Sequence, residues 1–410
     1  MPRWRDKFPQ SFWDPSRRRR WWVFFFLGVT TFAGLVVSGS FVIAYLNRPV
    51  TSKPLGPGPA APPTGAPPIV PPHGPPAGPP SNSSNLTFRV PLETAQAQYG
   101  AYFVSILVGT GSTIRIDTLL DTGSPDTWFD QSAGFVSGSL TYRPKSGSYS
   151  AAYMGGTVNG LIGSDVLKFG SYSWSQTFGV VSSNNLGLGG LMGLSRGGCT
   201  AQQLCAIGEW NLGQNVLAFY YDTHTWEGYF MGGYIAPNTY CAPGSSITYT
   251  PQVGHFYWQS TVSLYYNNVL LGSNIRAAFD TGSTYVIMNT VISNQVQLLS
   301  SATGGCTAPT MTAVINGVSF VIPPNVLVAP GSSSSNCRLR VSSFSGGGYP
   351  FDIILGATFL INFYTVFDLT NERIGFCYSQ PGLAASRRLE EGSDRLAKLL
   401  DHPERNRRIT

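Results

Sequence analysis

The tetrapeptide Asp121-Thr122-Gly123-Ser124, which follows the apolar pair Leu119-Leu120, occurs twice in this chain. The second copy, Asp280-Thr281-Gly282-Ser283, also follows an apolar pair. Each copy is followed, at almost the same distance, by two apolar residues and a glycine, namely Leu191-Met192-Gly193 and Ile354-Leu355-Gly356. A lone Asp-Thr-Gly is a common turn, but a repeated motif with a repeated partner at matched spacing indicates two similar lobes, each contributing one aspartate.

The residue types around each aspartate suit a buried, paired carboxylate. An aspartate after an apolar strand is directed toward the interior, and the glycine two residues later lets a partner approach closely. The following serine hydroxyl can donate to a carboxylate oxygen. Two carboxylates in contact do not both ionise, so they share one proton. Such a pair can serve as general base and general acid, which predicts hydrolysis of an amide by water.

The chain resembles the pepsin-type aspartic proteases over roughly residues 96–380. Besides the two motifs, Trp128 lies seven residues after Asp121, where the family has a tryptophan beside the site. Tyr153, in Tyr-Met-Gly-Gly-Thr-Val-Asn-Gly, aligns with the tyrosine of the family's flap. Segments similar to the family's first and closing strands are Tyr102-Phe103, Gly109-Thr110, Phe363–Asp368 and Arg373–Phe376.

This resemblance implies a mostly β, bilobal pepsin-like fold with the active-site cleft between the lobes. The N-terminal lobe is expected at 96–245 and the C-terminal lobe at 246–380. Asp121 and Asp280 are the expected catalytic residues, which hold the lytic water. The substrate is expected to be an extended polypeptide, and no metal or organic cofactor is needed.

The resemblance also implies supporting roles for the residues beside the dyad. Thr122 and Thr281 are expected to brace the lobes from beneath, and Gly123 and Gly282 to let substrate backbone approach. Ser124, together with Ser283 or Thr284, is expected to support the carboxylates or the substrate. The flap is expected to close over the peptide and exclude water, with Tyr153 at its tip and Trp128 beneath it. Taken singly, Tyr153 also suits a half-buried strand and Trp128 a core position.

Five positions depart from the family pattern. Met154-Gly155 replaces a Gly-Thr pair at the flap tip and so removes a hydroxyl. Pro125 follows the first serine, Ala357 stands where an aspartate is usual, and Ile353 stands where a tryptophan is frequent. Both aspartates are present, so these departures concern substrate preference and rate rather than the type of reaction.

Two other functions fit parts of this pattern. A catalytically silent, peptide-binding relative on a membrane surface is compatible with the altered flap tip, although both aspartates argue against it. Carbohydrate hydrolysis also uses two carboxylates, but the duplicated motif with its paired triplets has no role in that chemistry. Proteolysis is therefore the favoured interpretation.

Charge and histidine placement exclude other classes. Residues 1–50 hold eight Lys and Arg against two Asp and Glu, whereas residues 88–380 hold ten against thirteen. The basic excess therefore belongs to the terminal segments, so nucleic-acid binding is not expected. A metal site is not expected either, because the sequence has no Cys-x-x-Cys and its four histidines are scattered.

All six cysteines follow residue 198. By the family resemblance, Cys306 and Cys337 fit the disulfide loop of the second lobe. Cys199 and Cys205 are close enough to close a small loop, and Cys241 and Cys377 remain. The sequence alone leaves this connectivity open. An even number of cysteines suits an oxidising compartment.

Residues 21–46 contain no charged residue. At about 1.5 Å per residue they are long enough, as a helix, to cross a hydrocarbon core of about 30 Å. Arg17–Arg20 precede them, so residues 1–20 are expected to form a basic cytosolic tail. This pattern predicts a single-pass type II membrane protein with its catalytic domain luminal or extracellular. The alternative is a secreted protein with a cleaved signal peptide, for which the apolar run is long.

The remaining segments are expected to flank the enzyme. Residues 47–95 form a Pro-rich stem with glycosylation acceptors at Asn82 and Asn85, and residues 381–410 a charged tail. From Arg89 on, short apolar and β-branched runs separated by glycine, asparagine and serine indicate mostly β structure, with strands expected at Arg115–Leu120 and Phe256–Leu264 among others. Helices are expected at Ile292–Leu299 and in the tail at Glu390–Leu400. The protein is expected to be a monomer.

Overall fold

The structure is a computed structural model that describes residues 86–93, 101–111, 113–197, 204, 206–301, 308–329, 337–344 and 348–381. The expected cytosolic tail (1–20), the membrane anchor (21–46), both glycosylation acceptors and the charged tail after residue 381 lie outside these residues. Within the described ranges, no helix has the length and apolar character needed to cross a membrane.

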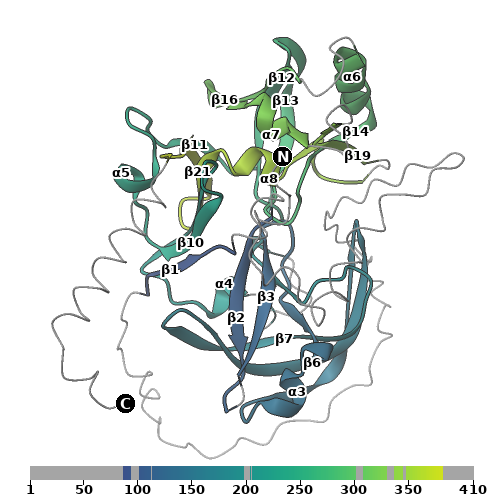
Figure 1. Ribbon diagram of the computed structural model, residues 1–410, viewed down its shortest axis with the longest axis vertical. Coiled ribbons are helices and arrows are strands. Elements are labelled where there is room, and N and C mark those ends of the chain that lie inside the picture. The colour runs from purple at the N-terminus through teal and green to yellow at the C-terminus, as the bar shows by residue number, and fades with distance from the viewer. Residues whose placement is uncertain are drawn as a thin grey trace, which may run out of the picture.

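The first half of the described chain forms a seven-stranded sheet in the order β2-β3-β8-β4-β7-β6-β5. It is the blue lobe in the lower part of Figure 1. Short helical segments, η4 (Gln131–Ala133), α3 (Phe135–Gly138) and α4 (Ala206–Glu209), accompany it. The strands are β2 (Phe103–Val108), β3 (Ile114–Asp121), β4 (Trp128–Asp130), β5 (Arg143–Tyr153), β6 (Gly156–Phe169), β7 (Tyr172–Asn184) and β8 (Gly190–Gly193).

The second half forms a matching seven-stranded sheet among the described residues, in the order β16-β15-β12-β13-β20-β14-β19. Its helices are α6 (Thr290–Ser301), α7 (Pro324–Leu327) and α8 (Ala357–Leu360), and a small pair joins β17 (Val328–Ala329) to β18 (Arg338–Leu339). The strands are β12 (Gln259–Tyr266), β13 (Val269–Phe279), β14 (Val286–Asn289), β15 (Met311–Ile315), β16 (Val318–Ile322), β19 (Val341–Phe344) and β20 (Ile353–Leu355).

The two sheets repeat one local arrangement at the motifs found in the sequence. β3 pairs in parallel with β8, which carries the first apolar-apolar-Gly triplet, and Asp121 lies opposite Gly193. β13 pairs in parallel with β20, which carries the second triplet, and Phe279 lies opposite Leu355. β4 and β14 then pair antiparallel with β8 and β20. The matched spacing in the sequence therefore corresponds to matched strand pairs.

A third sheet, which the sequence analysis did not foresee, takes strands from both halves. Its six described strands run β1-β10-β9-β21-β22-β11. The first half supplies β1 (Phe88–Pro91), β9 (Gln214–Asp222) and β10 (Glu227–Gly233), and the second supplies β11 (Thr248–Pro251), β21 (Phe363–Asp368) and β22 (Arg373–Tyr378). After α5 (Pro237–Tyr240), Cys241 forms a disulfide with Cys377 at the end of β22. The mostly β, bilobal fold is confirmed, and this sheet joins the lobes.

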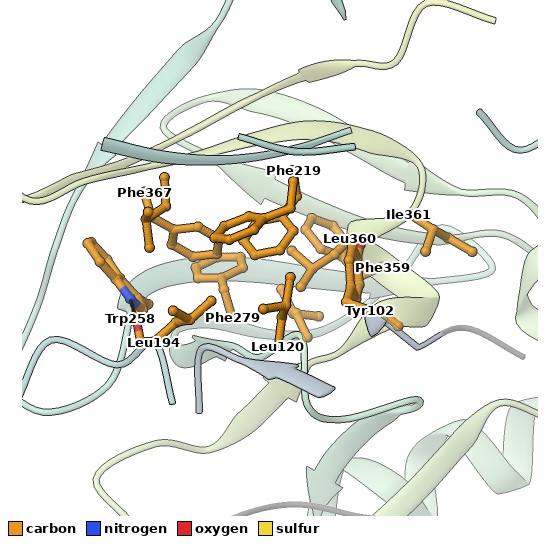
Figure 2. Close-up of a cluster of buried hydrophobic side chains, with 14 of the residues drawn as sticks. Tyr102, Leu120, Leu194, Phe219, Trp258, Phe279, Phe359, Leu360, Ile361 and Phe367 are labelled. Atoms are coloured by element: carbon orange, nitrogen blue, oxygen red, sulfur yellow. Dashed lines mark hydrogen bonds between the residues drawn. The ribbon is translucent and has the colours of Figure 1, made fainter. Parts of the chain in front are cut away.

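One hydrophobic core runs between the lobes and under the motifs (Figure 2). Leu120 and Phe279, the residues immediately before the two motif aspartates, lie in it and are almost completely buried. Phe219 of β9 and Phe367 of β21 cover it from the central sheet, with ring centroids 5.9 Å apart. The aspartates are therefore placed by the most deeply packed part of the molecule, which favours a rigid site.

Candidate active site

Two buried aspartates meet between the lobes, one from each copy of the motif. Asp121 ends β3 and is 0% exposed, and Asp280 follows β13 and is 2% exposed. The two residues before each aspartate are apolar and buried, so both faces of each strand end are covered by the protein. A carboxyl group at the end of such a strand has little water around it, so its environment is set by the protein.

Each carboxyl group is held by the same pair of donors. The backbone N–H of Gly123 donates to Asp121 Oδ1 at 2.8 Å, and Ser124 Oγ donates to Asp121 Oδ2 at 2.7 Å. Gly282 N and Ser283 Oγ donate to Asp280 in the same way, at 2.8 and 2.6 Å. The serine of each motif is thus the supporting hydroxyl. Thr284, the other candidate, instead offers its carbonyl oxygen to Thr358.

The motif glycines are required by the opposite carboxyl group. A Cβ built on Gly123 would lie 2.6 Å from Asp280 Oδ1, and one built on Gly282 would collide with the Asp121 carboxyl group. Real Cβ atoms do not approach other atoms this closely. The sequence analysis assigned these glycines to substrate approach, but the contact present here is with the partner carboxylate. Only glycine lets the two carboxyl groups face each other.

The two motif threonines brace the lobes through reciprocal hydrogen bonds. Thr122 N donates to Thr281 Oγ1, and Thr281 N donates to Thr122 Oγ1, both at 3.0 Å. Each hydroxyl also donates across the interface, from Thr122 to Phe279 O at 2.9 Å and from Thr281 to Leu120 O at 2.7 Å. The hydroxyls are buried and bonded on both sides, so the two motifs are fixed relative to each other.

The electrostatics of the pair favour one retained proton. Burial raises the pKa of Asp121 well above its usual value, and the charge of Asp280 raises it further. Burial also raises the pKa of Asp280, against hydrogen bonds from Ser283, Asp121 and Gly282. Hydrogen bonding between the two carboxyl groups raises the pKa of Asp121 and lowers that of Asp280. Two groups this close titrate as a pair, with one protonated while the other is ionised.

A hairpin formed by β5 and β6 carries the expected flap residue. Tyr153 ends β5 and pairs with Gly156, so that Met154 and Gly155 form the tip of the hairpin. Tyr153 is 8% exposed, and Trp128 Nε1 donates to its hydroxyl at 2.6 Å. Burial, the largest cause, raises the pKa of Tyr153 well above its usual value, and the charge of Asp121 adds to that rise. The tyrosine therefore lies near the dyad with its ring fixed by the tryptophan.

A small hollow beside the dyad is lined in part by two aromatic residues that the sequence analysis did not single out. Tyr257, Phe351 and Ile354 line it together with Gly123 and Asp280. They belong to an apolar cluster of the second lobe that packs partly through aromatic edges, as between Tyr257 and Phe351 with centroids 5.3 Å apart. The aromatic run Phe256-Tyr257-Trp258 could have indicated this hollow, but it was interpreted only as the start of a strand. A larger hollow of about 610 Å³ lies away from the dyad, around Pro237–Tyr249.

The expected disulfides are only partly described. Cys241 pairs with Cys377, the two cysteines that remained in the sequence analysis. Cys337 is also disulfide-bonded, but Cys306, Cys199 and Cys205 lie outside the described residues. Within the described part of the chain, no group of three His, Cys, Asp or Glu side chains is arranged to hold a metal ion.

Comparison with known proteins gives consistent matches over this region. The sequence model of the eukaryotic aspartyl proteases matches residues 101–379. Gastricsin of Mus musculus is 28% identical over 327 residues, covering 68% of this chain and 81% of the relative. Polyporopepsin of Irpex lacteus is 27% identical over 321 residues, covering 67% and 93%. The crystal structure of aspartic proteinase from Irpex lacteus, at 24% identity, shares the fold with a TM-score of 0.61 and covers 72% of this chain and 98% of its own.

Proposed function

The chain belongs to the eukaryotic aspartyl protease family, and we propose that it is an endopeptidase in which Asp121 and Asp280 activate water against a peptide bond. The observation that carries this proposal is the symmetry of the pair. Each buried carboxyl group accepts one backbone N–H and one serine hydroxyl, and each motif glycine lies against the opposite carboxyl group. Burying two carboxyl groups that face each other costs free energy, and a purely structural role would not offset that cost.

The reaction follows from one shared proton. The ionised carboxylate accepts a proton from a water held between the two groups, and the water oxygen bonds to the carbonyl carbon. The protonated carboxyl group donates to the carbonyl oxygen as the double bond opens. The diol collapses when the carboxyl group that took the water proton donates it to the amide nitrogen and the C–N bond breaks. One diol hydroxyl gives its proton to the other carboxylate, so that a carboxylic acid and an amine are released and the pair again holds one proton. The donors from Gly123, Ser124, Gly282 and Ser283 hold the carboxyl groups in place throughout.

The hairpin over the dyad supports an extended peptide as the substrate. Tyr153 and Trp128 fix one side of the hairpin, so that a peptide lying beneath it is held near the carboxyl groups and away from water. Two relatives that match this region are gastricsin and polyporopepsin. The altered tip at Met154-Gly155 is the observation that keeps a silent, peptide-binding relative as the second candidate.

One assay separates the two candidates. Purified full-length protein is incubated with an unfolded protein at acid pH, with and without a peptide transition-state analogue of the family. The proposal predicts cleavage that the analogue blocks. Tight binding of the analogue without cleavage supports the silent, peptide-binding relative. If the protein neither binds the analogue nor cleaves the unfolded protein, both candidate functions are contradicted.

We also propose that residues 21–46 anchor this enzyme in a membrane with the lobes on the luminal or outer side. The support is the uncharged apolar run after Arg17–Arg20 in the sequence. The protein should stay with membranes after a carbonate wash and gain mobility on deglycosylation, through Asn82 and Asn85. A mature native N-terminus near Phe41 would show instead that this run is a cleaved signal peptide.

A further inference from the structure

Met154 joins the hairpin to the lobe opposite the one it grows from. Tyr153, its neighbour, packs in a cluster of the first lobe that includes Trp128. Met154 is half-buried and packs against a cluster that belongs entirely to the second lobe. The buried members of that cluster are Tyr257, Ala278, Ile287, Phe344, Phe351 and Ile354. Two adjacent residues of one hairpin therefore hold it to both sides of the cleft.

The surface that Met154 touches is aromatic and adjoins the dyad. Phe351 packs against Tyr257 and Phe344, with ring centroids 5.3 and 6.0 Å apart. Tyr257, Phe351 and Ile354 also line the hollow beside Asp280. A thioether is flexible, polarizable and favourable against aromatic edges. The methionine thus makes an apolar contact next to the position where a peptide must lie to reach the carboxyl groups.

We propose that Met154 is a latch that holds the hairpin shut on the second lobe, and that a substrate must displace it. The proposal rests on the peptidase function proposed above. A peptide crossing the dyad passes between the hairpin and the aromatic cluster, so one of its side chains takes the place of the methionine. Gly155, next to it, is exposed and has no side chain to replace that contact. The fraction of molecules with the hairpin open then limits the apparent affinity.

A latch and a residue that packs on the bound substrate have different measurable consequences. Without the Met154 contact the open fraction rises, so peptides bind more tightly, by roughly fivefold for one partly buried side chain. If Met154 instead packs on the bound peptide, its removal weakens binding. A purely structural methionine changes the stability of the lobe and leaves both the hairpin and the affinity unchanged.

Hydrogen–deuterium exchange of the backbone amides at 152–158 tests the latch in the full-length protein without relying on catalysis. Met154→Ala and Met154→Gln should exchange several-fold faster than the parent, whereas Met154→Leu should restore the parental rate. Leu161→Ala is the matched control, because Leu161 lies on the same hairpin and is 63% exposed. Unchanged exchange in both the alanine and the glutamine variants overturns the proposal.

Binding of a non-cleavable transition-state-analogue peptide provides the second readout. The dissociation constant should fall roughly fivefold in Met154→Ala and in Met154→Gln. A dissociation constant that rises in both variants would show that Met154 packs on the bound peptide, and would overturn the latch. Since neither measurement needs turnover, a chain that exchanges faster and binds more tightly but does not cleave would refute the peptidase proposal and leave the latch standing.

Discussion

At the scale of single residues, the two motif threonines fix the position of one motif relative to the other. Thr122 and Thr281 each accept one backbone N–H from the other motif and donate to a carbonyl across the interface. All of these groups are buried, so water cannot replace a lost partner. The two hydroxyls therefore set the relative position of the aspartates that precede them.

Thr122→Val tests this brace. Valine keeps the shape but leaves Thr281 N and Phe279 O without their partner, which should lower the free energy of unfolding by about 2–5 kcal/mol. Urea unfolding measures the change. Thr118→Val is the matched control, because Thr118 is equally buried but its hydroxyl bonds only to Ile116 O, two residues away. Equal losses in the two variants would contradict the brace.

The shared proton predicts how stability depends on pH. Burial raises the pKa of Asp121 and of Asp280 above the unfolded value near 3.8, so the folded protein holds the proton more tightly. The contribution of the pair to the free energy of unfolding is therefore full below that value and is lost as pH rises through the raised pKa. In Asp121→Asn one carboxyl group is gone, and this loss should be smaller.

Urea unfolding of the parent and of Asp121→Asn between about pH 3 and 7 measures this difference. The variant should gain stability relative to the parent as the pH rises. Parallel curves for the two proteins would show that the pair does not hold a proton in common.

At the scale of elements, one hydrogen bond links the β5–β6 hairpin, the expected flap, to the strand beneath it. Trp128→Phe removes the N–H that donates to the Tyr153 hydroxyl, and Tyr153→Phe removes the hydroxyl. Each should lower kcat/KM about tenfold, the equivalent of a hydrogen bond worth about 1.4 kcal/mol, and the double variant should be no worse than either.

Steady-state kinetics of the parent, the two single variants and the double variant on one peptide measure this double-mutant cycle. Trp174→Phe is the matched control, since Trp174 also donates from Nε1 within the first lobe, but to Gln176. Fully additive losses at Trp128 and Tyr153, or an equal loss at Trp174, would refute the support assigned to the flap.

Local patterns in the sequence predicted most elements but not their long-range pairing. The run Arg115–Leu120 became β3 and Ile292–Leu299 became α6, because period and turn residues act locally. The run Phe256–Leu264 was predicted as strand from its start, yet β12 begins at Gln259. Trp258 Nε1 instead donates to Leu194 O, 64 residues away. No local pattern reports such a contact.

The site shows the same division. The two aspartates, the serines and the threonines were identified from a repeated motif, and the structure brings them together. The aromatic cluster around Phe351 was missed, because its buried members come from five separate stretches of the chain and only their packing unites them. Met154 was noted as a departure at the flap tip, but its contact with the opposite lobe depends on how the lobes face each other.

At the scale of the whole molecule, the central sheet and its disulfide tie the two halves together. Cys241 and Cys377 are 136 residues apart, so their bond closes a long loop that includes most of the second lobe. Replacing both with serine should lower the free energy of unfolding by about 2–5 kcal/mol. Thermal unfolding measures the loss, and a Tm equal to that of the parent would contradict this role.

The proposed peptidase function requires Asp121 and Asp280 to act as one unit. The most direct measurement is kcat on an unfolded protein at acid pH for the parent, Asp121→Asn, Asp280→Asn and the double variant, with folding checked by circular dichroism. Each single variant should lose at least about a thousandfold, and the double variant should be no slower than either, because a shared proton is lost once. A single variant that keeps near-parental kcat would contradict the paired role of Asp121 and Asp280.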